Sequence, residues 1–235
     1  MKILIKNIQS FHDSSLLADS KPDFIDTIRW KKIQALKNEA DKLRSLASGY
    51  LLDEMCREMQ ISKPLYKYGE KGKPYIEGHE NFAFNISHSG DYAVLVYCGG
   101  SNVLKSPEAF EMSTDYVLPQ AFGIDIQQIR FMREGMIKRI LHEKEMLPAG
   151  LSLEEENQYL NRIWSIKESY VKMTGEGLAL DFRKIFIDFE KGIVSAKNCE
   201  KAYFCEYHGL TGYALSICSN KPFFADIKEC VHLIE

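Results

Sequence analysis

Two segments, Asp91-Tyr-Ala-Val-Leu-Val-Tyr-Cys98 and Gly212-Tyr-Ala-Leu-Ser-Ile-Cys218, contain similar residues at similar depths in the two halves of the chain. Each is a short apolar run with aromatic residues that begins at a turn residue, which is typical of a strand. In both halves the strand accompanies a helical pattern and other strands. The repetition indicates an internal duplication. It predicts an α+β fold of two similar halves, each an antiparallel sheet packed with a long helix.

Two stretches carry a helical pattern. Residues 22–60 are predicted to be mostly helical. Their apolar side chains recur every three or four positions, as in Leu43, Leu46, Ala47, Tyr50 and Leu51. A stronger helix is predicted over residues 153–174. Ser152 and Glu155 form a capping box at its start, and Gly175 is a typical stop at its end.

The remaining runs predict strands and one long loop. Residues 82–86 and 92–97 read as a hairpin around the polar segment 87–91. Residues 99–119 are polar, contain two glycines and two prolines, and predict a long loop. Strands are expected at 121–126, 185–189, 202–207 and 213–218. We therefore divide the chain into an N-terminal half, residues 1–120, and a C-terminal half, residues 121–235.

Composition limits the class of protein. The chain has 235 residues and a net charge of −3, so bulk charge does not indicate a nucleic-acid partner. Its apolar runs are too short to span a bilayer, and we expect no membrane association. Six cysteines without C-x-x-C spacing predict reduced thiols in a cytoplasmic protein: Cys56, Cys98, Cys199, Cys205, Cys218 and Cys230.

The segment Trp164-Ser-Ile-Lys-Glu-Ser-Tyr-Val-Lys172 places a carboxylate one helical turn before an ammonium group. The apolar stripe of this helix consists of Tyr159, Ile163, Ile166, Tyr170 and Met173. At about 100° per residue, Glu168 and Lys172 lie roughly opposite its centre. Two interpretations follow: a solvent-exposed ion pair of the i,i+4 type, or part of a site that handles phosphate.

A second carboxylate lies in the predicted strand Phe122-Gly-Ile-Asp-Ile126. Alternation places Gly123, Asp125 and Gln127 on one face of this strand. A carboxylate in an apolar strand needs a partner, because an unpaired buried charge is unfavourable. Asp125 either accepts hydrogen bonds from a neighbouring turn or joins Glu168 as a ligand of Mg²⁺, which prefers carboxylate, phosphate and water oxygens.

Several polar and basic residues suit an anion. In Asn85-Ile-Ser-His-Ser89, the serines and His88 either bond local backbone in a turn or bind an anionic oxygen. Lys73 lies between a glycine and a proline and suits the same anion. Between residues 29 and 44, six basic residues accompany two acidic ones, either as a solvated helix face or as a polyanion site: Arg29, Lys31, Lys32, Lys37, Lys42 and Arg44.

In their order and separation, these elements resemble the 4′-phosphopantetheinyl transferase superfamily, in its larger, single-chain, surfactin-synthetase-activating type. The matching segments, together with Arg44 before them, are Gly72-Lys-Pro74, Asn85-Ile-Ser-His-Ser89, Gly123-Ile-Asp125 and Trp164 through Lys172.

The resemblance implies a function and a site. It implies transfer of the phosphopantetheine arm of coenzyme A to a serine hydroxyl of an acyl or peptidyl carrier protein, with release of adenosine 3′,5′-bisphosphate. Coenzyme A is then expected in the cleft between two pseudo-symmetric halves, with Mg²⁺ on its pyrophosphate. The duplicated chain is expected to be a monomer. Phosphate contacts are expected from the N-terminal half, and metal and catalytic residues from the C-terminal half.

The resemblance also implies residue roles. Asp125 and Glu168 hold the metal, and Glu168 is the candidate base for the carrier serine. Lys172 balances charge on the leaving phosphate, and Lys167 assists. The phosphates of coenzyme A are bound by Arg44, Lys73, Ser87 and His88, with Arg29 and Lys32 near the 3′-phosphate.

One position departs from the family pattern. Gln127 stands where many members carry a third acid, and its amide oxygen is expected to bind the metal directly or through water. This departure keeps two alternatives open: a non-catalytic protein that binds coenzyme A or a carrier, and a metal-dependent phosphohydrolase.

Overall fold

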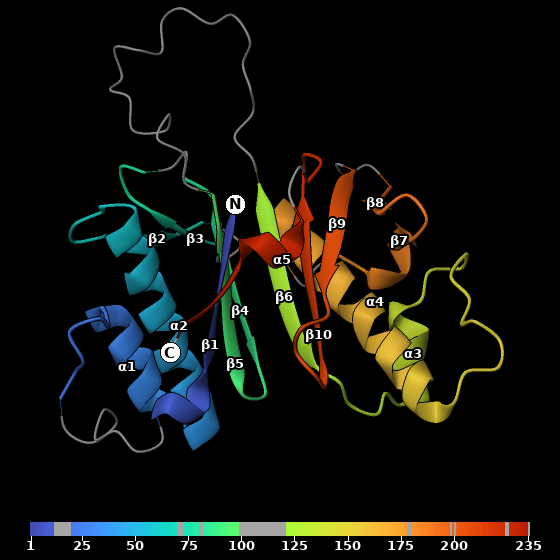
Figure 1. Ribbon diagram of the computed structural model, residues 1–235, viewed down its shortest axis with the longest axis horizontal. Helices are drawn as coiled ribbons and strands as arrows, with labels where there is room; N and C mark the ends of the chain where they lie inside the picture. Colours follow the sequence, from blue (N-terminus) through green and yellow to red (C-terminus); the bar gives the residue numbers. More distant parts are fainter. Residues whose placement is uncertain are drawn as a thin grey trace, which may run out of the picture.

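The computed structural model describes most of the chain, namely residues 1–11, 20–69, 73–79, 82–98, 121–177, 180–197, 199, 201–223 and 226–234. The expected 99–119 loop and the boundary at residue 120 lie outside these ranges. The described elements form two larger sheets and one small hairpin, with helices on both outer sides (Figure 1). The expected α+β class is confirmed.

The first sheet has the order β11-β1-β5-β4. Its strands are β1 (Lys2–Asn7), β4 (Phe84–Ser89), β5 (Tyr92–Tyr97) and β11 (Val231–Ile234). Strands β4 and β5 form the expected antiparallel hairpin, and β1 pairs antiparallel with β5. The C-terminal strand β11 pairs parallel with β1, so the chain ends in the sheet where it begins.

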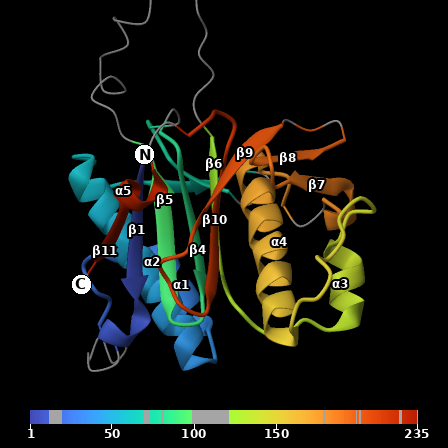
Figure 2. The ribbon, with the colours of Figure 1, turned by 45° about the vertical axis from the view of Figure 1, so that its right-hand side comes forward.

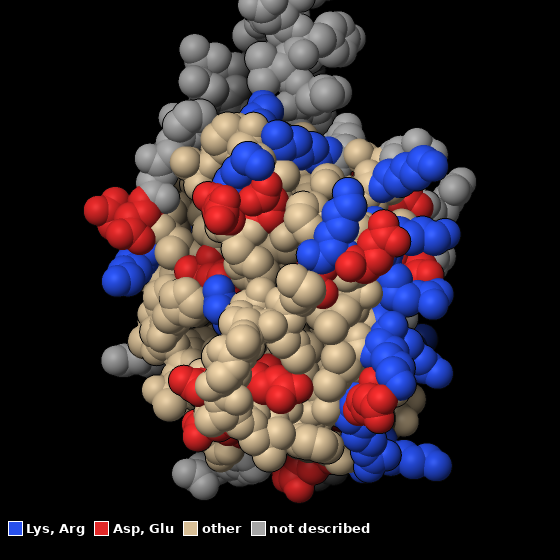
Figure 3. Space-filling model, turned by 90° about the vertical axis from the view of Figure 1, so that its right-hand side faces the viewer, with Lys and Arg blue, Asp and Glu red and all other residues tan. Residues whose placement is uncertain are grey.

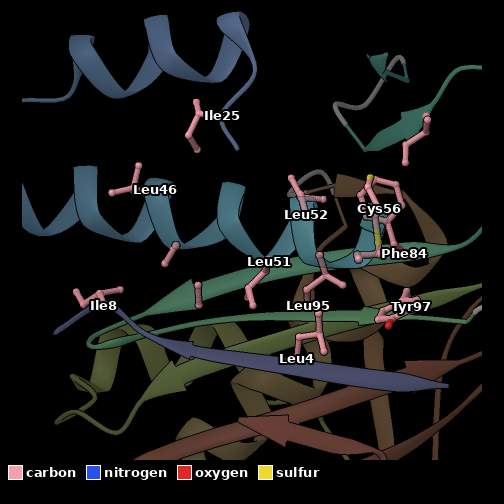
Figure 4. Close-up of a cluster of buried hydrophobic side chains, with 14 of the residues drawn as sticks. Leu4, Ile8, Ile25, Leu46, Leu51, Leu52, Cys56, Phe84, Leu95 and Tyr97 are labelled. Atoms are coloured by element: carbon pink, nitrogen blue, oxygen red, sulfur yellow. The ribbon is translucent and has the colours of Figure 1, made fainter. Parts of the chain in front are cut away.

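Two helices lie on the outer side of this sheet: one packs against the strands, and the other packs on that helix. They are α1 (Thr27–Ala35) and α2 (Glu39–Glu58), and they confirm the helical pattern of residues 22–60. Side chains such as Leu51 of α2, Leu4 of β1 and Leu95 of β5 pack together between helix and strands (Figure 4). The short elements η1 (Ile8–Phe11) and the hairpin β2 (Tyr66–Tyr68) and β3 (Pro74–Ile76) complete this half.

The second sheet is antiparallel throughout, in the order β6-β10-β9-β8-β7. Its strands are β6 (Phe122–Gln128), β7 (Ile185–Asp188), β8 (Ile193–Ala196), β9 (Ala202–Tyr207) and β10 (Tyr213–Ser219). The two repeated segments become β5 and β10, and each lies inside its sheet between two neighbours. The remaining elements are α3 (Glu134–Ile140), α4 (Leu153–Thr174), η5 (Phe182–Lys184) and α5 (Ile227–Cys230).

Helix α4 begins and ends where the sequence predicts. The Ser152 Oγ accepts from the backbone N of Glu155, and the Glu155 carboxylate accepts from the backbone N of Ser152 at 2.8 Å. Gly175 ends the helix with a φ of 74°, a conformation that glycine adopts without a Cβ clash. The helix packs against β6 and β10 on the side of the second sheet away from the first (Figure 2).

The two sheets pack face to face through a shared apolar layer. Ile3 and Ile5 of β1 lie in this layer together with Ile124 and Ile126 of β6, whereas Leu4 packs with residues of α2. This alternation is the period-two pattern of a strand. The result is four layers, helix, sheet, sheet and helix.

Two expectations from composition can be compared with the structure. All six cysteines are free thiols. Within the described ranges, no helix has the length and hydrophobicity needed to cross a membrane.

Candidate active site

The two halves are joined by side chains of β4 that bond the backbone of β6. Three alternate side chains of β4 accept from three alternate N–H groups of β6: Asn85 from Ile124 at 3.0 Å, Ser87 from Ile126 at 3.4 Å and Ser89 from Gln128 at 3.0 Å. We call this set the β4–β6 ladder. Backbone pairing with β5 continues to Ser89, whereas the sequence suggested a turn from residue 87 onward.

The ladder places Ser87 beside Asp125. The Ser87 Oγ donates to Asp125 Oδ1 at 2.9 Å. The Lys172 ammonium lies 2.6 Å from the same carboxylate oxygen and 2.8 Å from the Ser87 Oγ. Asp125 is 6% exposed, so this charge is compensated mainly by protein groups. The three residues come from β4, β6 and α4 and meet at one point.

Gly123 allows this meeting, because it lets β6 approach α4 closely. A Cβ at residue 123 would lie 1.9 Å from the carbonyl oxygen of Ser169 and 2.5 Å from the backbone N of Met173. Only glycine fits at this distance. The close approach brings the end of α4, with Lys172, next to Asp125.

The exposed-pair interpretation of Glu168 and Lys172 is wrong. Lys172 forms its ion pair with Asp125, and no ion pair of Glu168 is found in the described part of the chain. Burial raises the pKa of Glu168 above its ordinary value, and the Asp125 carboxylate raises it further, with Lys172 acting in the opposite direction. Glu168 therefore lies close enough to Asp125 for the two carboxylates to repel each other.

These carboxylates fit a divalent cation. The Asp125 Oδ2 is buried and has no hydrogen-bond partner, which is unusual for a buried carboxylate oxygen. A hard cation would satisfy this oxygen and relieve the repulsion between Asp125 and Glu168. Among the described residues, no group of three or more His, Cys, Asp or Glu side chains suits a metal. Substrate oxygens and water would have to complete such a site.

Gln127 lies two residues after Asp125 and borders a pocket of about 300 Å³. Its amide nitrogen donates to the carbonyl oxygen of Gln128 at 3.1 Å. Trp164 of α4 borders the same pocket and packs against Phe182, with ring centroids 5.2 Å apart. The position that departs from the family pattern thus lies at the edge of an accessible hollow.

Arg44, which forms an ion pair with Asp41, and His88 lie near each other at the N-terminal half. The Arg44 guanidinium is 17% exposed and donates to the carbonyl oxygen of Gly90 at 2.9 Å. His88 is exposed by surface area, but loss of solvation lowers its pKa below the ordinary value. The charges of Arg44 and Lys172 lower the pKa of His88 further. An anion bound here would reverse both electrostatic effects.

Lys73 reaches across to the C-terminal half. Its ammonium donates to the carbonyl oxygen of Met173 at 3.2 Å, near the C-terminal end of α4. A cation is favourable there because the last carbonyl groups of a helix carry partial negative charge. Burial lowers the pKa of Lys73 below its ordinary value. The structure therefore brings Lys73 to the residue next to Lys172.

The other basic residues between 29 and 44 divide into two groups. Lys31 and Lys32 on α1 are exposed, as expected of a solvated helix face, and so is Lys37 in the connection after it, whereas Arg29 and Lys42 are half-buried. The Arg29 Nε is buried without a hydrogen-bond partner, and the Lys32 ammonium lies 4.4 Å from the centroid of the Tyr68 ring. A different face, that of the C-terminal half, also carries Lys and Arg side chains along one edge of its surface (Figure 3).

Both halves of the chain are similar to known proteins. A family model described as "4'-phosphopantetheinyl transferase superfamily" matches residues 121–218. A second, "4'-phosphopantetheinyl transferase, N-terminal", matches residues 22–99. The chain is 26% identical over 216 residues to the 4′-phosphopantetheinyl transferase ffp of Bacillus subtilis, covering 88% of each chain. It is 25% identical over 211 residues to Sfp of Bacillus subtilis (strain 168), covering 86% of this chain and 85% of the relative.

The chain belongs to the 4′-phosphopantetheinyl transferase superfamily. It is an enzyme of the larger, Sfp-like type, and both of its halves match models of this family.

The position of Lys167 in this transferase contradicts the catalytic role that was expected for it. The Lys167 side chain is 0% exposed and forms an ion pair of 2.6 Å with Glu145. It also donates to the carbonyl oxygens of Ile140 at 2.6 Å and Phe182 at 3.2 Å. An ammonium has three donors, so none remains for a substrate. Lys167 is a structural residue of the transferase.

Sequence reasoning missed the bonding partners of the polar residues that surround the site. Asn85 and Ser89 bond β6, and Asn157 and Asn161 of α4 bond the segment after β6. The alternation of Asn85, Ser87 and Ser89 was a signal that one polar face of a strand meets a partner. No comparable signal marks the two asparagines of α4, because their partners are backbone groups about 25 to 31 residues away.

Proposed function

We propose that this transferase moves the 4′-phosphopantetheine arm of coenzyme A to a serine hydroxyl of an acyl or peptidyl carrier protein, in a reaction that requires Mg²⁺. The observation that carries the proposal is the buried, unpaired Oδ2 of Asp125 beside Glu168, within reach of Lys172. Family membership supports the transfer, and this carboxylate pair supports a metal-assisted reaction on a pyrophosphate.

Asp125 and Glu168 would hold the Mg²⁺, with Gln127 at its edge. When bound, the cation supplies neutralisation of negative charge on the pyrophosphate. Because Asp125 Oδ1 is already bonded to Ser87 and Lys172, only Oδ2 is free to become a ligand. The protein thus fixes the orientation of Asp125 before a ligand binds.

Glu168 accepts the proton of the carrier serine. The serine oxygen forms a bond to the phosphorus that carries the phosphopantetheine arm, and the bond from that phosphorus to adenosine 3′,5′-bisphosphate breaks. A carboxylate whose pKa is raised is a better proton acceptor than an ordinary one. Lys172 lies beside Asp125 and balances the charge that develops on the leaving phosphate.

The phosphates of coenzyme A bind to basic residues of the N-terminal half. Arg44 and His88 lie near each other, Lys73 bonds the carbonyl oxygen of Met173 next to Lys172, and Ser87 bonds Lys172. Arg29 and Lys32 contribute positive charge on α1. Charge-assisted bonds to phosphate are stronger than neutral ones, and the arginine is suited to a bidentate contact.

The two halves play different parts in this proposal. Residues 1–120 supply coenzyme A contacts and residues 121–235 supply metal and catalytic groups, so one chain holds one site. The enzyme is therefore a monomer with one coenzyme A site, and the six free thiols fit the cytoplasm. Sedimentation combined with a coenzyme A titration tests this: an obligate trimer with shared sites would contradict it.

The activity is tested by mass spectrometry of apo carrier proteins incubated with the enzyme, coenzyme A and Mg²⁺. The expected result is a mass gain of one phosphopantetheine arm and release of adenosine 3′,5′-bisphosphate only when a carrier is present. Release without a carrier would indicate a phosphohydrolase. Binding of coenzyme A with no release on any carrier would indicate a non-catalytic binding protein.

A further inference from the structure

Lys167 is the most completely buried charged group in the described part of the chain, and it lies one residue before Glu168. Its ammonium bonds three separate segments: the end of α3 at Ile140, the connection after α3 at Glu145, and η5 at Phe182. Its carboxylate partner extends the connection, because Glu145 also accepts from the backbone N of Ile187 in β7 at 3.0 Å. One side chain of α4 thus holds the elements that pack beside it.

The segment that begins after β6 and ends with α3 is held against α4 at both ends. At its start, the Asn161 amide donates to the carbonyl oxygen of Arg130 at 2.8 Å, and Asn157 accepts from the backbone N of Met132 at 2.8 Å. At its end, Lys167 bonds Ile140. The first five residues of this segment, 129–133, have no regular secondary structure, so these side-chain bonds hold its backbone in place.

This segment forms one wall of the pocket beside Gln127 and Trp164. Phe131, Met132 and Met136 contribute side chains to the wall, and Phe131 is 68% exposed. Asn161 and Trp164 of α4 also line the pocket, and the Trp164 ring packs on Phe182, the residue whose carbonyl oxygen Lys167 bonds. Lys167 therefore bonds both the end of this segment and the residue that packs on Trp164, and it does not line the pocket.

We propose that Lys167 is a positioning residue: its buried ammonium fixes the pocket formed by residues 130–136 and Trp164, and through that pocket the binding of the acceptor protein. The kinetic part of this inference rests on the proposed function. Of the residues assigned to coenzyme A and its metal, only Gln127 borders the pocket, so the rest of the lining is available to the second substrate. Lys167 contacts neither substrate.

The test uses two variants that break the support at different places. Lys167→Met removes the ammonium, and Asn161→Ala frees the start of the same segment. Because a lone buried Glu145 destabilises the fold, Lys167→Met is also made together with Glu145→Gln, which removes the uncompensated charge. Arg162→Met is the matched control, since Arg162 forms a two-bond ion pair with Glu206 from the same helix but does not line the pocket.

The kinetic readout separates acceptor binding from chemistry. We expect KM for the apo carrier to rise about tenfold in the Lys167 and Asn161 variants, the scale of one lost charge-assisted bond. The Kd for coenzyme A should stay within about a factor of two, because those contacts lie elsewhere. Arg162→Met should change neither. A fall in kcat with unchanged acceptor KM would overturn the inference, because Lys167 would then act on the reaction itself.

A second readout does not depend on activity. The chain has two tryptophans, so Trp30→Phe leaves Trp164 as the fluorescent reporter in the pocket. We expect acrylamide to quench Trp164 more strongly in the Lys167 and Asn161 variants than in wild type or Arg162→Met. Equal quenching in all of them would show that Lys167 only stabilises the fold. If wild type transfers nothing to any carrier, the proposed function fails, and quenching alone still decides the positioning role.

Discussion

The Oγ of Ser87 donates a 2.9 Å hydrogen bond to Oδ1 of Asp125, so the two sheets of this transferase meet at a carboxylate of its candidate site. Lys172 of α4 bonds both partners and adds the helix of the C-terminal half to the same point. The arrangement leaves the other oxygen of Asp125 buried and unpaired. The relative position of the two halves and the orientation of the carboxylate are therefore set by the same few bonds.

Ser87→Ala should lower both stability and activity. It removes a hydrogen bond to a charged partner, which is worth about 1.5–3 kcal/mol, and it frees Asp125 to rotate. We expect urea unfolding to show a loss of about that size and kcat/KM to fall about tenfold or more. Ser89→Ala is the control, because Ser89 belongs to the same ladder but does not bond Asp125. Equal losses of activity in both variants would contradict the assigned role of Ser87.

The local structure was predictable from the sequence because its signals are local. The capping box at Ser152 and the glycine at 175 define α4, and alternation in the segment 122–126 defines the face that carries Asp125. The β4–β6 ladder was not predictable in the same way. Its donors lie 39 residues after its acceptors, and no residue pattern in either strand indicates that the two strands pair with each other.

Lys167 shows how a motif can mislead where periodicity does not. It lies four residues after Ile163 and three before Tyr170, which places it on the apolar stripe of α4. The helical pattern alone therefore indicates burial, as the structure finds. The resemblance placed it in the reaction because it precedes Glu168. Adjacent residues on a helix point about 100° apart, so neighbours in a motif need not share a site.

Glu168→Gln should stabilise the metal-free protein while removing most activity. Because burial and Asp125 raise the pKa of Glu168, the folded state favours the protonated carboxyl. Its contribution to stability is therefore fully present below the ordinary pKa and is lost as pH rises through the raised value. At neutral pH the variant avoids this loss, and its melting temperature in EDTA should exceed that of wild type.

The stability gain should reverse when Mg²⁺ is added. Wild type should then be stabilised more than Glu168→Gln, because a ligand that binds the folded state shifts the melting temperature upward. Thermal unfolding of both proteins with EDTA and with Mg²⁺ decides this. If the variant and wild type melt at the same temperature in EDTA, burial and Asp125 do not destabilise the ionised form of Glu168.

Coenzyme A binding should be accompanied by proton uptake at His88. In the free enzyme, loss of solvation and the charges of Arg44 and Lys172 lower the pKa of His88, so the ring is neutral at pH 7. A polyphosphate beside the ring favours the imidazolium and raises this pKa. Affinity should therefore fall as pH rises through the pKa of the complex.

Calorimetric titrations of coenzyme A in buffers of different ionisation enthalpy measure this uptake. We expect it in wild type and expect it to be reduced in His88→Gln, which keeps a hydrogen-bonding side chain but cannot titrate. Because Glu168 also titrates near the site, the difference between the two proteins is the informative quantity. The same uptake in both would show that the phosphates bind away from His88.

Gln127→Glu should tighten Mg²⁺ binding to the coenzyme-free enzyme. Residue 127 lies two positions after Asp125 on β6 and borders the pocket with Trp164, so strand alternation places it on the carboxylate side. With only Asp125 and Glu168 anionic, the wild-type site binds the metal weakly until pyrophosphate oxygens complete the octahedron. A third carboxylate supplies charge in their absence. We predict no direction for the change in turnover of Gln127→Glu, because the added charge also repels coenzyme A.

Calorimetric titration of Mg²⁺ into three coenzyme-free proteins measures this effect. The expected order of affinity is Gln127→Glu above wild type above Glu168→Gln, which lacks one anionic ligand. Gln128→Glu is the matched control, because it adds the same charge on the same strand but one residue further along, where alternation turns the side chain to the other face. If Gln127→Glu and Gln128→Glu bind Mg²⁺ equally, the gain comes from net charge alone, and position 127 does not face the metal.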